Sequence, residues 1–87
     1  MRPTLRQLEY FVAVAEFEAF GPAADSLNVT QPSLSKQIAV LEEELGLSLF
    51  ERTSRSVALT SHGVSLLAEA RKVLNAGLHF KSEAQRL

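Results

Sequence analysis

Residues 28–46 read NVTQPSLSKQIAVLEEELG and contain, in order, a tight turn, the start of a helix, its apolar stripe and its end. Asn28 tolerates the left-handed backbone that ends a preceding helix. Thr30 can cap a new helix, with Pro32 in its first turn. Apolar residues then recur at spacings of four, three and four, ahead of the C-terminal cap residue Gly46: Leu34, Ile38, Leu41 and Leu45. The segment therefore predicts an amphipathic helix that follows another helix after a turn of only a few residues.

The first half of this predicted helix has a polar surface without acidic residues. No Asp or Glu occurs from Ser26 to Leu41, and the polar positions are Gln31, Ser33, Ser35, Lys36 and Gln37. Such a face suits the major groove of DNA, where Gln can pair with adenine, Lys can donate to guanine and Ser can serve either role. The free N–H groups of the helix start can also approach a phosphate. The alternative is that the face is only a solvated helix surface.

Two helices are predicted before this segment. Thr4 can cap the first, at about residues 5–18, where apolar residues recur at helical spacing: Leu5, Leu8, Phe11, Val12 and Ala15. Phe20-Gly21-Pro22 interrupts the pattern, and Pro22 is suited to the first turn of a second, short helix. The inward residues of that helix are expected to be Ala23, Ala24 and Leu27. Its two adjacent alanines indicate close contact between helices.

A small hairpin and a long helix are predicted after this segment. The polar turn 52–56 lies between the apolar residues Leu47, Leu49 and Phe50 and the alternating pair Val57 and Leu59. Thr60 or Ser61 can cap a last helix that runs to about residue 85, with buried candidates at Val64, Leu67, Ala70 or Arg71, Leu74, Leu78 and Phe80. This helix would be about 40 Å long, more than so small a domain can cover. We therefore expect it to pair with another chain.

Composition excludes several classes of function. The 87 residues, 46% hydrophobic and 22% charged, are typical of one small folded domain. The absence of cysteine excludes disulfides, thiolate zinc sites and cysteine nucleophiles, and His62 and His79 lack the neighbours that a metal or catalytic site needs. We expect no enzyme, no cofactor and no metal. No apolar run approaches a membrane span and the start is unlike a signal peptide, which favours a cytoplasmic protein.

The charges are segregated along the chain. A net charge of -1 argues at first sight against a nucleic-acid partner. However, Arg52 and Arg55 lie close together in the predicted hairpin, and we expect Glu42, Glu43 and Glu44 to form the water-facing end of their helix, outside the groove. Each arginine belongs either to a solvated turn or to a wing that reaches the minor groove or its phosphates. We favour contact for Arg55, at the tip, over Arg52, which can pair with Glu51 or a helix.

A pattern of spaced residues extends through the whole chain: Leu5-Arg6-Gln7-Leu8-Glu9-Tyr10-Phe11, Ala23-Ala24, Leu27, Val29-Thr30-Gln31-Pro32-Ser33-Leu34-Ser35-Lys36-Gln37-Ile38, Leu41-Glu42, Leu45-Gly46, Leu49-Phe50-Glu51-Arg52, Leu59-Thr60 and Gly63. In these positions the chain resembles the LysR-type transcriptional regulators. The resemblance implies a mainly α fold: a winged helix-turn-helix domain at residues 1–60, with a three-helix core and a small β-hairpin wing, and a dimerisation or linker helix at residues 61–87. It also implies that the C-terminal effector-binding domain of full-length members is absent from this chain.

The resemblance assigns roles to individual residues. DNA contacts fall in the recognition helix, about 31–45, at Thr30, Gln31, Pro32, Ser33, Ser35 and Lys36, and in the wing at Arg55, with Arg52 as a further candidate. The candidate dimer contacts in the last helix are Val64, Leu67, Leu74 and Leu78. Two features depart from the family pattern. Lys36 stands where many relatives have Arg, which exchanges a planar fork for a point charge. Phe20-Gly21-Pro22 replaces the usual polar residues at a common phosphate contact, which is then lost or supplied by backbone N–H groups.

The sequence thus predicts a bacterial LysR-type regulator, associated with the nucleoid, that binds double-stranded DNA at a promoter operator. Two recognition helices in one homodimer predict an interrupted palindromic site with half-sites about one helical turn or more apart. The full-length protein would form a dimer or a tetramer. We expect the chain to be a fragment, on which a small-molecule inducer cannot act because the ligand-binding domain is missing. The alternative from another class is a winged-helix protein-interaction module that does not bind DNA, with which the acidic balance is compatible.

Overall fold

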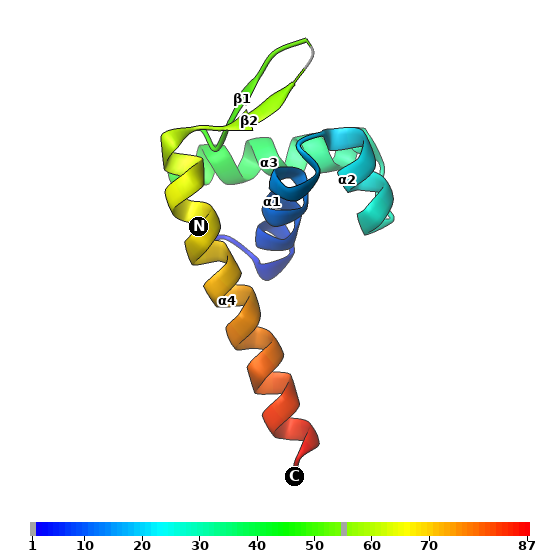
Figure 1. The fold of residues 1–87 in the computed structure, drawn as a ribbon, viewed down its shortest axis with the longest axis vertical. Helices are drawn as coiled ribbons and strands as arrows, with labels where there is room; N and C mark the ends of the chain where they lie inside the picture. The colour runs from blue at the N-terminus through cyan, green and yellow to red at the C-terminus, as the bar shows by residue number, and fades with distance from the viewer. Residues whose placement is uncertain (1, 55) are drawn as a thin grey trace.

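A computed structural model describes residues 2–54 and 56–87 and contains four helices and one hairpin. The helices are α1 (Leu5–Phe17), α2 (Phe20–Leu27), α3 (Gln31–Leu45) and α4 (Ser61–Gln85), and the strands are β1 (Phe50–Arg52) and β2 (Val57–Leu59). The first three helices form a head from which the hairpin projects at one end and α4 at the other (Figure 1). The predicted mainly α, winged helix-turn-helix fold is confirmed.

Side-chain caps begin three of the helices, as the sequence indicates. Thr4 accepts a hydrogen bond from the Gln7 N–H at 3.1 Å, and the Gln7 side chain in turn accepts one from the Thr4 N–H at 2.9 Å. The Thr30 and Thr60 hydroxyl oxygens accept from the N–H groups three residues further on, at 3.3 Å and 2.9 Å. Each cap satisfies an N–H that has no partner inside its helix and contributes about 1 kcal/mol.

Left-handed residues end the first three helices. Asn28 and Gly46 have φ values of 56° and 70°, as expected, and Glu18 ends α1 with a φ of 54°. The break between helices expected at Phe20-Gly21-Pro22 lies earlier in the chain. The α2 helix already begins at Phe20, and Pro22 occupies its third position. The chain therefore passes from α1 to α2 through Glu18 and Ala19 alone.

The core lies where the first three helices meet the base of the hairpin. Its most deeply buried side chains are Phe11, Val14, Leu34, Ile38, Leu41 and Leu49. Phe50 packs edge-on against Phe11, with 5.6 Å between ring centroids. Burial of such side chains contributes about 1.5–3 kcal/mol each. Ala23 and Ala24 are buried, which confirms the expected close contact of α2.

The hairpin is short and antiparallel, with Arg52 at the outer end of β1. Phe50 pairs with Leu59 near the core and Arg52 pairs with Val57 further out. Across the turn, the Thr53 N–H donates to the Ser56 carbonyl at 2.9 Å. The predicted contact residue Arg55 lies outside the described residues.

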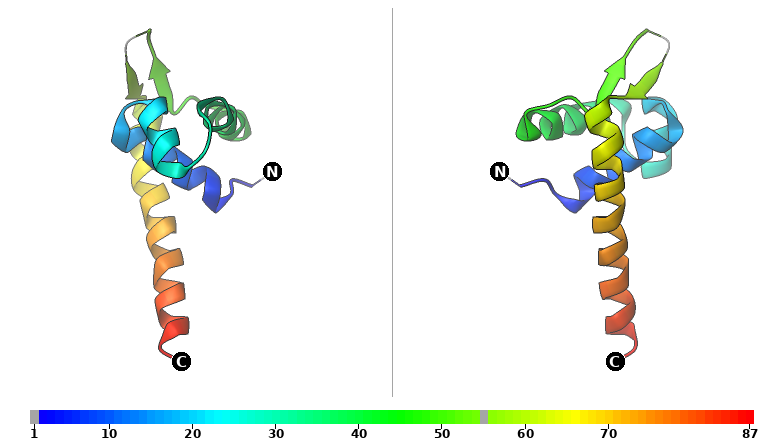
Figure 2. Two further views of the ribbon diagram at one scale, coloured as in Figure 1. Left: turned by 90° about the vertical axis from the view of Figure 1, so that its right-hand side faces the viewer. Right: turned by 60° about the vertical axis from the view of Figure 1, so that its left-hand side comes forward.

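The start of α4 is attached firmly to the head. The Thr60 hydroxyl donates to the Ser48 carbonyl at 2.6 Å, and a Cβ on Gly63 would overlap the Leu49 carbonyl oxygen. Only glycine allows this approach. Two views at other angles show that the rest of α4 extends straight away from the head (Figure 2). No helix in the described part of the chain is long and apolar enough to span a membrane.

Half of the expected buried positions of α4 are not covered by the described part of the chain. Ala70 is buried and Leu67 packs against the core, whereas Val64, Leu78 and Phe80 are 60%, 64% and 77% exposed. Arg71 is exposed and pairs with Glu16 of α1 at 3.5 Å. The start of α1 lies beside Leu74 and Leu78, but the described part of the chain leaves Leu78 and Phe80 largely exposed.

Candidate nucleic-acid interface

The α3 helix is covered on one side only, which divides its surface into strips. Successive residues of an α-helix point about 100° apart. The buried residues Leu34, Ile38 and Leu41 define the inner side, and the strip directly opposite, here called the crest, consists of Pro32, Lys36, Ala39 and Glu43. All four crest residues are exposed. The wing lies along one flank of the crest and the start of α1 lies along the other.

Two of the predicted DNA-contact residues lie on the crest. Pro32 stands in the first turn of α3 and Lys36 follows one turn later, both exposed. Lys36 forms no ion pair within the described residues. Its amine is therefore available to a partner that approaches the crest.

Two others lie on the wing flank. Gln31 and Ser35 line a hollow between the start of α2, α3 and the hairpin, together with Gly21, Arg52 and Ser56. We call it the wing-side hollow. It is open to the surface and offers an amide and hydroxyl groups.

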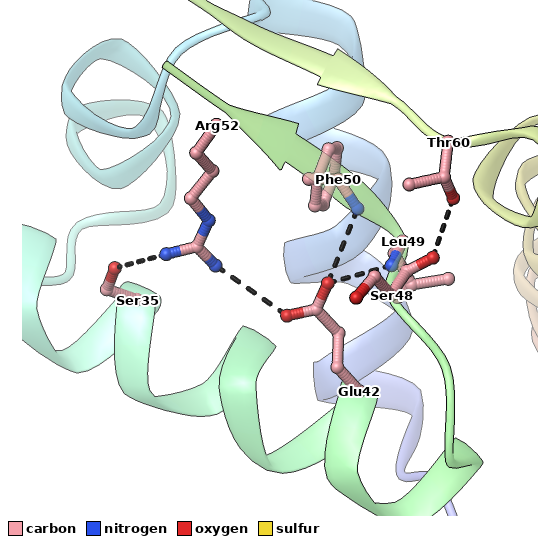
Figure 3. Close-up of polar contacts among 7 residues, drawn as sticks. All are labelled: Ser35, Glu42, Ser48, Leu49, Phe50, Arg52 and Thr60. Atoms are coloured by element: carbon pink, nitrogen blue, oxygen red, sulfur yellow. Dashed lines mark hydrogen bonds and ion pairs between the residues drawn. The ribbon is translucent and has the colours of Figure 1, made fainter. Parts of the chain in front are cut away.

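Arg52 lines this hollow, and its guanidinium connects β1 with α3 (Figure 3) and with α2. Its Nη1 donates to Ser35 Oγ at 3.5 Å and its Nη2 lies 3.8 Å from Glu42 Oε1, both on α3. Its Cζ lies 4.4 Å from the centre of the Phe20 ring, at the start of α2. The expected partner Glu51 is not used, whereas the expected pairing with a helix is observed. Arg52 thus holds the wing strand β1 against both helices of the helix-turn-helix.

The expectation that Glu42, Glu43 and Glu44 all face water is wrong for two of the three. Only Glu43 is on the crest and exposed. The Glu42 Oε2 accepts hydrogen bonds from the Leu49 N–H at 2.7 Å and the Phe50 N–H at 3.3 Å (Figure 3). Both Glu44 carboxylate oxygens are covered, with no hydrogen-bond partner in the described residues. Three consecutive residues point about 100° apart, so they cannot share one face of a helix.

The remaining candidates, Thr30 and Ser33, lie on the α1 flank. Both line a second hollow, between α3, the α2–α3 turn and the start of α1, which we call the α1-side hollow. The Thr30 hydroxyl donates to Ser33 Oγ at 2.9 Å while it also caps the helix. Thr30 therefore serves the fold, and the Ser33 hydroxyl keeps its own proton for a partner.

Two residues of this surface were not predicted from the sequence as parts of it. Phe20 was treated as a break between helices, and Glu42 as a water-facing acid. Both contact Arg52, which is 32 residues from Phe20 and 10 from Glu42. One indication of this cluster was present in the sequence, namely that Arg52 can pair with a helix.

The chain matches the family described as "Bacterial regulatory helix-turn-helix protein, lysR family" over residues 5–64. It belongs to the lysR family. Among its relatives, YnfL of Escherichia coli K12, an uncharacterized HTH-type transcriptional regulator, is 48% identical over 100% of this chain and 29% of YnfL. The DNA-binding transcriptional dual regulator OxyR of the same strain is 56% identical over 80% of this chain and 23% of OxyR.

A solved structure, the BenM_DBD/benA site 1 DNA complex, matches with a TM-score of 0.92 and 46% identity. The match covers 97% of this chain and 94% of that one. The chain spans less than a third of the length of the two curated relatives. Its likeness to lysR-family proteins therefore concerns their helix-turn-helix part.

The lysR-family chain carries a second exposed surface on α4. Of the four predicted dimer residues, Val64 and Leu78 are largely exposed and Leu74 is half-buried, while Leu67 packs against the core of its own chain. Leu74 and Leu78 border a groove with Leu5 and Gly77. This surface is apolar, unlike the polar surface around α3.

A metal site does not form in the part of this lysR-family chain that the structure describes. No three His, Cys, Asp or Glu residues gather there in a way that could hold an ion. His62 and His79 are exposed and lie 17 positions apart on α4. Both relatives named above are transcriptional regulators by description, and neither is described as an enzyme.

Proposed function

We propose that this chain binds double-stranded DNA sequence-specifically, as the reading domain of a lysR-family transcriptional regulator, with α3 in the major groove. The observation that carries the proposal is the crest of α3 with its two hollows, where amide, hydroxyl and amine groups surround a helix start that itself contains no acid, and where Glu18 is the one acid among the described lining residues. The major groove is about 12 Å wide and admits one helix. The similar BenM_DBD structure is itself a complex with DNA.

Each strip of α3 then has a separate part in binding. Gln31 and Ser35, in the wing-side hollow, read base edges with an amide and a hydroxyl. Lys36 and Pro32, on the crest, enter the groove most deeply. Thr30 and Ser33 lie at the helix start, where N–H groups favour a phosphate. The wing follows the DNA outside the groove, with Arg55 at the minor groove or its phosphates and Arg52 bracing β1 beneath it.

We further propose that two chains pair through α4. Val64, Leu74 and Leu78 present apolar surface that the described part of the chain leaves uncovered. Burial of apolar surface contributes about 25 cal/mol per Å², which favours a second copy of the same helix as its cover. Two heads related by a two-fold axis predict an interrupted palindrome as the binding site.

The test is fluorescence anisotropy with the chain's own upstream DNA and a scrambled duplex of equal length, over a series of salt concentrations. Tight binding to the native duplex that weakens steeply with salt is expected. Gln31→Ala should reduce the preference for the native duplex by about 1–3 kcal/mol. The matched control is Gln85→Ala, which removes an exposed amide from the far end of α4.

The outcomes separate DNA reading from protein binding. Equal, weak binding of both duplexes by the unaltered chain at low salt would contradict sequence-specific reading and would favour a protein-interaction module. For the dimer, sedimentation equilibrium should give a dimer for the unaltered chain and a monomer for Leu78→Asp. A monomeric unaltered chain at high concentration would contradict pairing through α4.

A further inference from the structure

The α1-side hollow contains two residues of α1, Arg6 and Tyr10, that the proposed function has not used. It is lined by Arg6 and Tyr10 of α1, Asn28 of the turn, and Thr30, Ser33 and Gln37 of α3. Its position is fixed by a contact between α1 and α3, since Gln7 Nε2 donates to Gln37 Oε1 at 3.5 Å. The start of α1 therefore lies directly beside the first half of the recognition helix.

This hollow and the wing lie on opposite flanks of the crest. Gln37 faces α1 and Ser35 faces Arg52 of the wing. Two residues along an α-helix point about 200° apart, so the two contacts leave α3 in nearly opposite directions, with Lys36 between them. A helix in the major groove has one sugar-phosphate backbone along each flank. The wing lies on only one flank of α3, so it can contact only one of these two backbones.

Arg6 is an unpaired cation at this second flank. Of the eight described Lys and Arg residues, Arg52, Arg71, Lys72 and Arg86 form ion pairs. Arg6 is exposed and forms neither an ion pair nor a hydrogen bond within the described residues. An exposed guanidinium with five free donors suits the oxygens of a phosphate.

Tyr10 supplies a second, independent observation. The residue is only 7% exposed, yet it lines the α1-side hollow and its hydroxyl has no hydrogen-bond partner in the described residues. That hydroxyl oxygen is not fully buried, so a partner in the hollow can approach it. The Ser33 hydroxyl accepts from Thr30 and thus keeps a proton to donate. Arg6, Tyr10 and Ser33 thus bring three donors of different kinds to the lining of one hollow.

We propose that the α1-side hollow binds a backbone phosphate of the DNA strand on the flank opposite the wing. Arg6 supplies the charge, and the Tyr10 and Ser33 hydroxyl groups donate to the phosphate oxygens. The inference rests on the proposed function. A phosphate contact carries no sequence information itself, but it fixes how far α3 turns within the groove.

The first experiment compares Arg6→Gln and Arg2→Gln in the same anisotropy series. Arg2 is the matched control, because it is exposed and unpaired but lines a groove between α1, α3 and α4. Arg6→Gln should weaken binding to the native and scrambled duplexes alike, by about tenfold, and should lower the salt slope by about 0.9. Arg2→Gln should leave both quantities unchanged. Arg6→Lys should recover most of the slope, since it restores the charge.

The second experiment locates the phosphate. Single methylphosphonate substitutions along each strand remove one charge at a time, and one position, on the strand away from the wing, should weaken the unaltered chain but leave Arg6→Gln unaffected. Tyr10→Phe, which keeps the ring and so the core, should weaken binding about threefold to tenfold without a change in melting temperature.

The outcomes distinguish this inference from the proposed function. An unaltered chain that binds neither duplex overturns both. If the unaltered chain binds its DNA and Arg6→Gln keeps the full affinity and salt slope, the phosphate site is wrong while the reading of DNA by α3 stands. An Arg6→Gln effect that no methylphosphonate position reproduces also overturns it.

Discussion

In the first half of α3, from Gln31 to Gln37, the polar side chains line open hollows or stand exposed on the crest, whereas Glu42 and Glu44 in the second half are turned toward the rest of the protein. The helix is continuous and has the same apolar stripe throughout. The difference arises from its surroundings, because the chain that leaves α3 turns back along its second half to form β1. In the proposed function, one helix therefore carries recognition at its start, while its end holds the wing through Glu42. Substitutions in the two halves should accordingly have effects of different kinds.

The largest expected effect is a loss of stability in the second half. Glu42→Ala removes the acceptor of the Leu49 and Phe50 N–H groups and the ionic partner of Arg52. We expect the free energy of unfolding to fall by about 2–3 kcal/mol and the melting temperature by about 10–20 °C. Glu43→Ala is the control on the crest and should change stability by less than about 0.5 kcal/mol. If both variants lowered the melting temperature equally, the contacts of Glu42 would stabilise the fold no more than the exposed Glu43 does.

In the first half, a substitution should change binding and leave stability intact. Lys36→Ala removes an exposed, unpaired amine from the crest. It should weaken binding to DNA by about tenfold, by loss of a charge-assisted contact, with an unchanged melting temperature. Lys81→Ala, at an exposed position far along α4, is the control in the same anisotropy measurement. Unaltered binding of Lys36→Ala would show that the crest does not enter the groove.

Thr30 belongs to the first half of the helix region but is expected to affect stability, because its hydroxyl caps α3 and also donates to Ser33. Thr30→Ala should cost about 1 kcal/mol of stability, measured by chemical denaturation. Thr30→Ser keeps the capping oxygen and should recover most of that loss. A Thr30→Ser variant as unstable as Thr30→Ala would mean that the threonine methyl group, and not the cap, stabilises this end.

The smallest expected effect is at the contact between the wing and α2. Arg52→Lys keeps the charge near Glu42 but loses the planar group above the Phe20 ring. A double-mutant cycle with Phe20→Leu should give a coupling energy of about 0.5–1 kcal/mol in unfolding experiments. A coupling near zero would indicate that Arg52 holds β1 through α3 alone.

The sequence predicted best the features that depend on neighbouring residues. The caps at Thr30 and Thr60, the left-handed Asn28 and Gly46 and the stripe of α3 each follow from a few adjacent positions, and all are observed. The Arg52 cluster joins residues 10 to 32 positions apart, so no local pattern could specify it. The length of α4 was predicted, but its periodicity did not show which residues α1 covers. Phe80 was thus expected to be buried and is exposed.

The junction between the head and α4 has a mechanical consequence for the proposed dimer. Gly63 lies against the Leu49 carbonyl and Thr60 is bonded to Ser48, so the head and the helix form one piece without a hinge between them. The helix of 25 residues is an arm about 37 Å long. A rotation of about 10° at its far end would displace the head by about 6 Å, nearly two base pairs along a duplex. In the proposed dimer, two such arms held together would set the separation of the heads, and a tilt at the far end of α4 would move the head with it.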